Sequence, residues 1–139
     1  MVEYTKEDVI QHRKDWVSAL RSGQYKQGRG YLRSKNNEYC CLGVACELAG
    51  VEAVLSLRDR DEEEDEDTYY YGDVYDVNNS MLLPIDVISY YGLTDCEGSY
   101  SDNNESFHSL VMENDEHFLN FNEIADIVEK EPKGLFVNV

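Results

Sequence analysis

Basic side chains and glycines come together between residues 24 and 35, and this composition could bind an anionic ligand. Two tyrosines that could stack on a base accompany the cations, so the candidate ligand-binding residues are Tyr25, Lys26, Arg29, Tyr31 and Arg33. Neither a Gly-x-Gly-x-x-Gly pattern between strand and helix nor a phosphate loop ending in Gly-Lys-Ser/Thr is present, so nucleotide hydrolysis lacks its usual machinery. Two interpretations stay open: a small anionic ligand, or a hairpin whose basic edge faces water or the protein's own acidic half.

An acidic run occupies residues 59–67, where eight of the nine residues are Asp or Glu. Repulsion between these carboxylates predicts an extended, flexible loop. A calcium-binding loop needs glycine at its sixth position and glutamate at its twelfth, but counting from Asp59 these positions hold Glu64 and Tyr70. We therefore predict no metal site here, but a partner-binding surface made of Asp61, Glu62, Glu63, Glu64, Asp65, Glu66, Asp67, Tyr69 and Tyr70.

The charge of the chain is divided unevenly along the sequence. Its 139 residues contain 29 Asp and Glu against 12 Lys and Arg, which gives a net charge of -17. The part through Arg58 has nine basic and seven acidic residues, whereas the part from Asp59 has three and twenty-two. Such an acidic surface argues against direct nucleic-acid binding, and it predicts a basic protein partner reached by electrostatic steering.

The length and hydropathy of the chain predict one domain that does not enter a membrane. A chain of 139 residues has the usual size of a single domain. No apolar run approaches the roughly 20 residues that cross a bilayer, and the first ten residues lack the basic lead and apolar core of an export signal. We expect a cytoplasmic location.

The cysteines and histidines do not form a recognisable metal or catalytic pattern. Cys40, Cys41, Cys46 and Cys96 lack the pairwise spacing of a zinc knuckle, and we interpret them as reduced, small, buried hydrophobic residues. Zinc binding with His108 or His117, or a reactive thiol, are the alternatives. No spacing forces an acid and a base together, so we predict no catalytic residues and no cofactor, and the sequence leans against an enzyme. Acid–base catalysis by Asp or Glu with His108 or His117 stays open as a third function.

Helical periodicity and capping residues predict five helices. Thr5 and Asn120 each offer an N-cap with a carboxylate three residues later, and Gly50 and Gly92 each follow an apolar segment as C-terminal stops. The predicted helices cover residues 6–21, 42–49, 84–91, 107–114 and 121–130. Gly43 near the start of the second helix should allow close backbone packing. The core candidates around the third helix are Leu82, Ile85, Ile88 and Leu93.

Two β-hairpins are predicted between these helices. Residues 31–33 and 39–42 flank the polar turn 34–37, and residues 68–71 and 74–77 flank the Gly72-Asp73 dipeptide. Residues 99–104 are polar and without periodicity, which is typical of a turn. Most of the tyrosines fall on predicted strands, where they would pack across a half-buried sheet. The fold class is therefore α+β, with helices and hairpins around one core.

Several segments carry a resemblance to a known kind of protein. The segments W-V-S-A-L-R-S-G-Q-Y-K-Q-G-R-G-Y-L-R, Y-C-C-L-G-V-A-C-E-L-A-G, L-P-x-x-V with Y-Y-G-L, and F-N-E-I-A-D-I-V-E span residues 16–131. This pattern resembles a family of small uncharacterised proteins encoded by tailed bacteriophages and prophages. The resemblance implies a small viral accessory protein, with no catalytic set to carry over, and the acidic run looks like an insertion relative to it.

These observations predict a non-enzymatic phage accessory protein. In the host cytoplasm it would bind and inhibit or redirect a basic host protein through its acidic, tyrosine-bearing surface, for instance a protein of antiviral defence. DNA mimicry is a narrower version, although a flexible run does not hold the regular spacing of phosphates. The alternative is a small-molecule binder that sequesters a nucleotide signal through the basic hairpin at 25–35.

Overall fold

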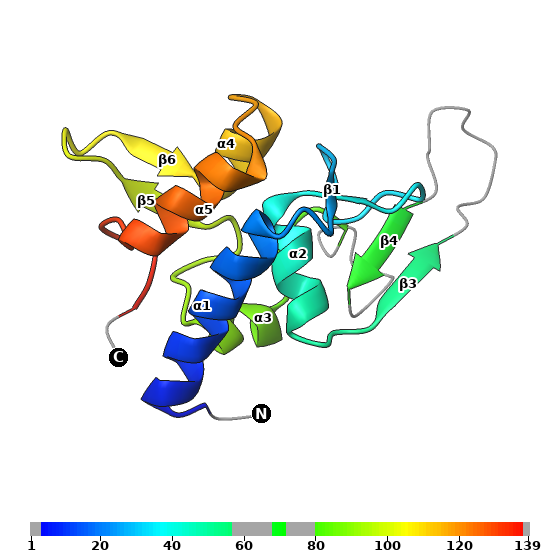
Figure 1. The fold of residues 1–139 in the computed structure, drawn as a ribbon, viewed down its shortest axis with the longest axis horizontal. Helices are drawn as coiled ribbons and strands as arrows, with labels where there is room; N and C mark the ends of the chain where they lie inside the picture. The colour runs from blue at the N-terminus through cyan, green and yellow to red at the C-terminus, as the bar shows by residue number, and fades with distance from the viewer. Residues whose placement is uncertain (1–3, 57–67, 72–79, 138–139) are drawn as a thin grey trace.

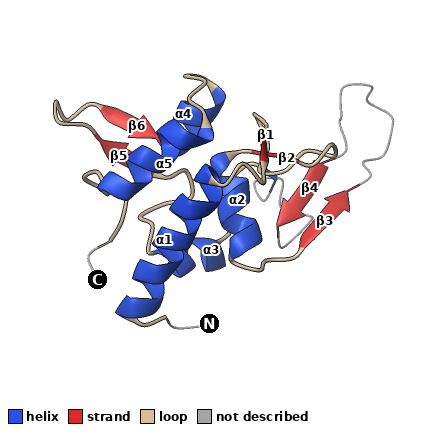
Figure 2. Cartoon of the chain, in the orientation of Figure 1, coloured by secondary structure: helices blue, strands red, loops and turns tan. Residues whose placement is uncertain are grey.

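The computed structural model describes residues 4–56, 68–71 and 80–137, and it confirms a mixed α+β fold (Figure 1). Short strand pairs flank a group of packed helices (Figure 2), and one cluster of buried side chains joins the two. In chain order the elements are α1 (Lys6–Arg21), β1 (Lys26–Gln27), β2 (Glu38–Tyr39), α2 (Cys41–Leu48), β3 (Ala53–Ser56), β4 (Thr68–Tyr71), α3 (Ile85–Tyr91), β5 (Ser99–Ser101), β6 (Phe107–Ser109), α4 (Leu110–Asp115) and α5 (Phe121–Lys130).

Helix α1 forms over the residues that the sequence predicts. The Thr5 hydroxyl accepts a hydrogen bond from the backbone N–H of Asp8, and the Asp8 carboxylate accepts one from the N–H of Thr5, both at 3.1 Å. This reciprocal capping satisfies two of the N–H groups that a helix start leaves open. Trp16 is fully buried on the inner face, where its ring N–H donates to the carbonyl of Cys41. Helix α5, which has a similar capping box at Asn120, packs alongside α1 (Figure 1).

A buried arginine ties α1 to the end of α3 and to the C-terminal segment. The Arg13 guanidinium donates to the carbonyl of Tyr91 at 2.7 Å and to that of Gly92 at 3.4 Å. It also pairs with the Glu131 carboxylate at 2.8 Å and lies 3.9 Å from the centre of the Phe136 ring. Arg13 therefore satisfies carbonyls that α3 leaves open at its end.

Three of the four cysteines are buried as predicted, whereas Cys96 is partly exposed, and α2 confirms the prediction for Gly43. Cys40, Cys41 and Cys46 are buried and unpaired, and burial raises the pKa of the Cys40 thiol to about 12, so this thiol stays neutral. The sulfur of Cys40 accepts the backbone N–H of Gly43 and so serves as the N-cap. A side-chain carbon at Gly43 would overlap the carbonyl oxygen of Leu32, which lies directly against the helix.

Helix α3 was predicted correctly, but its buried face was not. The helix follows Pro84 and ends at Gly92 in the left-handed conformation, as the sequence indicates. The buried side chains are Leu83, Val87 and Tyr91, at a helical spacing of four, together with Leu93. Ile85 is 64% exposed, and Leu82 and Ile88 are only partly buried. The helix is thus rotated relative to the predicted orientation, and only Leu93 of the four core candidates is fully buried.

The strand pairings differ from the predicted hairpins. The first hairpin is reduced to one antiparallel bridge between Arg33 and Tyr39, and β2 instead pairs in parallel with β1. In the second, β4 pairs in antiparallel fashion with β3, residue Ala53 opposite Tyr71, whereas the predicted partner 74–77 lies outside the described residues. In the first hairpin, pairing of β2 with the more distant β1 therefore outweighed the local turn signal.

The segment 99–109 forms a third strand pair that the sequence did not indicate. β5 pairs with β6, with Tyr100 opposite His108, so His108 lies on a strand and not on the predicted helix. The helix α4 starts only at Leu110, after the Ser109 hydroxyl accepts the N–H of Met112 as its N-cap. The β5–β6 and β3–β4 hairpins lie at opposite ends of the long axis of the molecule (Figure 1).

Candidate functional site

The acidic run joins the ends of two paired strands. Residues 61–67, the carboxylate part of the predicted partner-binding surface, lie outside the described residues. The strand residues next to the run are described. Ser56 at the end of β3 pairs with Thr68 at the start of β4, and Asp67 directly precedes Thr68 in the chain. The β3–β4 hairpin is therefore the described element that carries the acidic run.

Strand β4 is held firmly against the body of the protein. The backbone N–H of Tyr69 donates to the carbonyl of Arg33 at 3.2 Å, and the guanidinium of Arg33 lies 3.9 Å from the centre of the Tyr69 ring. The hydroxyl of Tyr71 donates to the Glu47 carboxylate of α2 at 3.1 Å, and burial raises the pKa of Tyr71 well above its usual value. These contacts make β4 the inner strand of the hairpin and β3 the outer one.

The two tyrosines of the predicted partner-binding surface have different surroundings. Tyr69 is partly exposed and can contribute to a surface beside the acidic run. Tyr70 is only 2% exposed, so the prediction that its side chain contacts a partner needs correction. Tyr70 and Tyr71 point to opposite faces of β4 and both are buried, so this end of the strand is covered on both faces. Tyr39, Tyr69 and Tyr71 confirm the interpretation of strand tyrosines as packing residues, while Tyr75 lies outside the described residues.

The basic residues of the alternative ligand site do not converge on one point. The ammonium group of Lys26 lies 3.3 Å from the carboxylate of Glu38. The guanidinium of Arg29 instead lies over the ring of Phe118, 4.8 Å from its centre. Arg33 faces α2 and β4, as described above. The three cations are therefore directed to three different intramolecular partners.

In that alternative site, Arg33 and Tyr25 also contact other side chains of the protein, and Tyr31 is partly buried. Arg33 donates to the side-chain oxygen of Asn37 at 2.8 and 3.1 Å, and to Glu47 at 3.4 Å. Tyr25 packs edge-on against Tyr39, with ring centres 5.3 Å apart, and Tyr31 is partly buried. Among the described residues, these cations therefore contact Glu38, Glu47 and Phe118, and neither carboxylate belongs to the acidic half that starts at Asp59.

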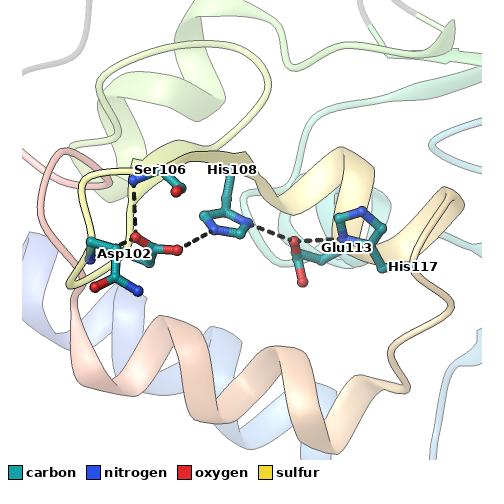
Figure 3. A network of polar contacts seen from close by, with 6 residues as sticks. Asp102, Ser106, His108, Glu113 and His117 are labelled. Atoms are coloured by element: carbon teal, nitrogen blue, oxygen red, sulfur yellow. Dashed lines mark hydrogen bonds and ion pairs between the residues drawn. The ribbon is translucent and has the colours of Figure 1, made fainter.

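A chain of histidines and carboxylates, which the sequence did not indicate, lies on β6 and α4 (Figure 3). The Nε2 atom of His108 is 2.8 Å from Asp102 Oδ2, and its Nδ1 atom is 3.3 Å from Glu113 Oε1. The same Glu113 oxygen lies 2.9 Å from His117 Nδ1. The other oxygen of Asp102 accepts the backbone N–H groups of Asn104 and Ser106, which fixes this carboxylate in the hairpin turn.

This geometry favours the imidazolium form of His108. A ring with an acceptor at each nitrogen satisfies both only when both nitrogens carry a proton. The hydrogen bond to Asp102, supported by that to Glu113, raises the pKa of His108 above 6.5. The ring also stacks on Tyr100 at 5.2 Å, and burial raises the pKa of that tyrosine to about 12. Through its two nitrogens His108 links the β5–β6 turn to α4.

Most of this chain matches one protein family. The model of a family described as a domain of unknown function, DUF8296, matches residues 9–132. The chain belongs to the DUF8296 family. No curated protein and no solved structure matches it.

The DUF8296 match starts within α1 and extends just past the end of α5. It includes the β3–β4 hairpin with the acidic run, the basic stretch and the His108 network. Within the described ranges of this DUF8296 domain, no three His, Cys, Asp or Glu side chains are placed to hold a metal ion. In the same part of the chain, no helix is long and apolar enough to cross a membrane.

The network around His108 makes the stability of the DUF8296 domain depend on pH. Replacing His108 by glutamine is expected to lower the free energy of unfolding at mildly acidic pH. Because the folded pKa of His108 is raised, its contribution is fully present below 6.5 and is lost as the pH rises through the folded value. Asp102 has a lowered pKa, so its contribution is lost as the pH falls below 3.8. Urea denaturation of both proteins across this pH range measures the difference.

Nitrogen NMR of the imidazole rings provides the control for this prediction. The ring of His108 should titrate above the value of a free histidine, with both nitrogens protonated on the acidic side of that titration. A ring that titrates at or below 6.5, or a wild-type advantage that grows with rising pH, would contradict the assigned geometry.

Proposed function

We propose that this DUF8296 protein is a non-enzymatic accessory protein of phage or prophage origin that binds a basic host protein in the host cytoplasm. The observation that carries the proposal is the concentration of negative charge after residue 58, where 22 acidic residues stand against three basic ones. The run at 59–67 supplies eight of these carboxylates and is attached to the rigidly held β4 strand. Binding of the partner would inhibit or redirect it.

Internal ion pairs support a partner that is basic. Cations of the N-terminal third are paired with carboxylates within the fold, as in Arg13–Glu131, Arg21–Asp126, Lys26–Glu38 and Arg33–Glu47. Each of these pairs neutralises one positive and one negative charge, so the net negative charge of the protein stays the same. An unbalanced negative field attracts basic proteins and accelerates their association, and it weakens as salt is added.

Retention of proteins from a bacterial lysate on the immobilised protein tests this proposal. At low ionic strength we expect basic proteins to be retained and then released by molar sodium chloride, since the Debye length falls to about 3 Å. A variant with Glu63, Glu64, Asp65 and Glu66 changed to their amides should lose most of this retention. Failure of the wild-type protein to retain any basic protein would overturn the proposal.

A matched variant distinguishes the effect of the acidic run on retention from the effect of the net charge. Glu7, Asp86, Glu97 and Glu116 are exposed. Converting these four to amides changes the net charge by the same amount as the first variant. It should leave retention close to that of the wild-type protein. Equal losses in the two variants would show that total charge, and not the acidic run, attracts the partner.

A further inference from the structure

A cavity of about 430 Å³ lies where α1 and α5 pack against each other. This volume is within the range of about 300–1,000 Å³ that small-molecule sites occupy. Val17 and Val128, which are 7% and 1% exposed, form its apolar floor, and Ile10 adds a third apolar side chain. Because α1 and α5 run side by side (Figure 1), a ligand in this cavity would contact both helices and remove apolar surface from water.

Two ion pairs between α1 and the end of α5 border the cavity. Arg13 pairs with Glu131, and Arg21 pairs with Glu129, both at 2.8 Å, and all four residues line the cavity. Arg21 lies eight residues after Arg13, or about 12 Å along α1, which matches the length of an extended chain of about eight carbon atoms. The described part of the lining contains no other Asp or Glu. Its carboxylates are therefore already paired with guanidinium groups, so the cavity offers little to a cationic ligand.

Two hydrogen-bond donors of α1, Lys14 and Ser18, also line the cavity. Among the described residues, no carboxylate pairs with the ammonium group of Lys14, and the hydroxyl of Ser18 forms no side-chain hydrogen bond. The two residues are four apart in sequence, so they are neighbours on one face of the helix. Because both groups donate and Lys14 is positively charged, they favour a ligand with an anionic acceptor group.

The cavity opens away from the described residues that border the undescribed segments. α1 packs on α2 through its buried face, beyond which the β3–β4 hairpin lies (Figure 1), whereas Lys14 is exposed. Tyr4, at the N-terminal end, packs against His12. Because His12 is two residues from Lys14, these two side chains project on opposite sides of the helix. Val137, at the C-terminal end, contacts the side chain of Arg13 instead of Lys14.

We propose that this cavity binds a small amphipathic carboxylate, with its carboxylate group at Lys14 and Ser18 and its apolar chain along Val17 and Val128. The ammonium and hydroxyl groups donate to the carboxylate oxygens, and burial of the chain supplies most of the affinity. The net charge of -17 repels multiply charged anions, which favours a ligand with a single negative charge. The site contains no residue of the acidic run, so this inference goes beyond the proposed function and is independent of it.

Three probes separate the contributions of charge and chain. Octanoate has both, octanamide keeps the chain and loses the charge, and acetate keeps the charge and loses most of the chain. In NMR titrations of the full chain at low salt, octanoate should shift the backbone amides of Lys14 and Ser18 with a Kd of about 10 mM or less. Octanamide should bind about fivefold more weakly, the equivalent of one exposed ion pair. Acetate should bind at least about tenfold more weakly, because it buries little apolar surface.

Substitutions of exposed residues test the same inference from the side of the protein. Lys14→Gln should weaken octanoate binding about fivefold and leave octanamide binding unchanged. Lys6→Gln is the matched control, because Lys6 is an exposed residue of the same helix that does not line the cavity. For the apolar chain, Ile10→Ala should weaken octanoate binding about threefold. Ile85→Ala, at an exposed position outside the cavity, should bind octanoate like the wild type.

The outcomes that overturn this inference leave the proposed function untouched. The carboxylate site is wrong if octanoate shifts no amide of α1 or α5, or if octanamide or acetate binds as tightly as octanoate. It is also wrong if Lys6→Gln and Lys14→Gln weaken binding equally, since net charge would then explain the effect. Should a variant fail to fold, the comparison of the three probes on the wild-type protein still decides. Recognition of a basic partner depends on the acidic run and is tested separately by the lysate experiment.

Discussion

Substitution of Gly43 by alanine is expected to destabilise the protein by about 3 kcal/mol or more, because the new methyl group has no space. It would overlap the carbonyl oxygen of Leu32 and lie 2.7 Å from the carbonyl carbon. Both are backbone atoms, and Leu32 is itself fully buried, so neither can move without displacing the N-terminus of α2. Thermal denaturation followed by circular dichroism should show a midpoint lower by about 10 °C.

Gly50 supplies a control that separates overlap from the general cost of replacing a glycine. It has a φ of +75° and follows α2, but a side-chain carbon there would meet no atom within 4 Å. Gly50→Ala should therefore cost only about 1–2 kcal/mol, the price of the left-handed conformation. A Gly43→Ala protein as stable as Gly50→Ala would show that α2 and Leu32 separate easily, contrary to the packing described.

The helices could be predicted because their signals are local. The hydroxyl of Thr5 and the amide of Asn120 lie three residues before their capping carboxylates, and Gly92 lies directly after the helix that it ends. Such contacts need only one turn of chain. The buried face of α3 was missed because Leu83 and Ile85 are equally apolar in sequence. Packing against the rest of the core decides which of them is buried.

The strand pairs could not be predicted, because their partners are distant or weakly marked in sequence. β4 pairs with the short segment Ala53–Ser56 across the acidic run, and the sequence carries no local signal for this pairing. The burial of Tyr70 was not predicted either. Propensity on a short strand is a weak indicator compared with the packing available to it.

The candidate sites were predictable only where composition alone marks them. The acidic run is evident from its charge, whereas the His108 network needs the β5–β6 pairing to bring Asp102 to the ring. One signal was available, because Glu113 and His117 are four residues apart and would face each other on a helix. With 29 acidic residues in the chain, that spacing alone does not distinguish a network from chance.

Replacing Asn114 by alanine is expected to cost about 3 kcal/mol or more, because several buried polar groups would lose their partner. Asn114 is fully buried at the end of α4. Its side-chain oxygen accepts the backbone N–H of Cys41 at 3.2 Å and the amide of Gln27 at 2.8 Å, while its nitrogen donates to the carbonyl of Gly28 at 2.9 Å. Urea denaturation measures the loss, and Asn103→Ala at an exposed position should change stability by less than about 0.5 kcal/mol.

A double-mutant cycle with Gln27 shows whether Asn114 acts through these hydrogen bonds or only through its volume. The amide of Gln27 also donates to the carbonyl of Leu119 at 2.9 Å, so Gln27→Ala removes one bond that depends on Asn114 and one that does not. The cost of Gln27→Ala should therefore be smaller in the Asn114→Ala background than in the wild type, by about 0.5–1.5 kcal/mol. Strict additivity would contradict the bond between the two amides and would leave lost packing as the reason why Asn114 matters.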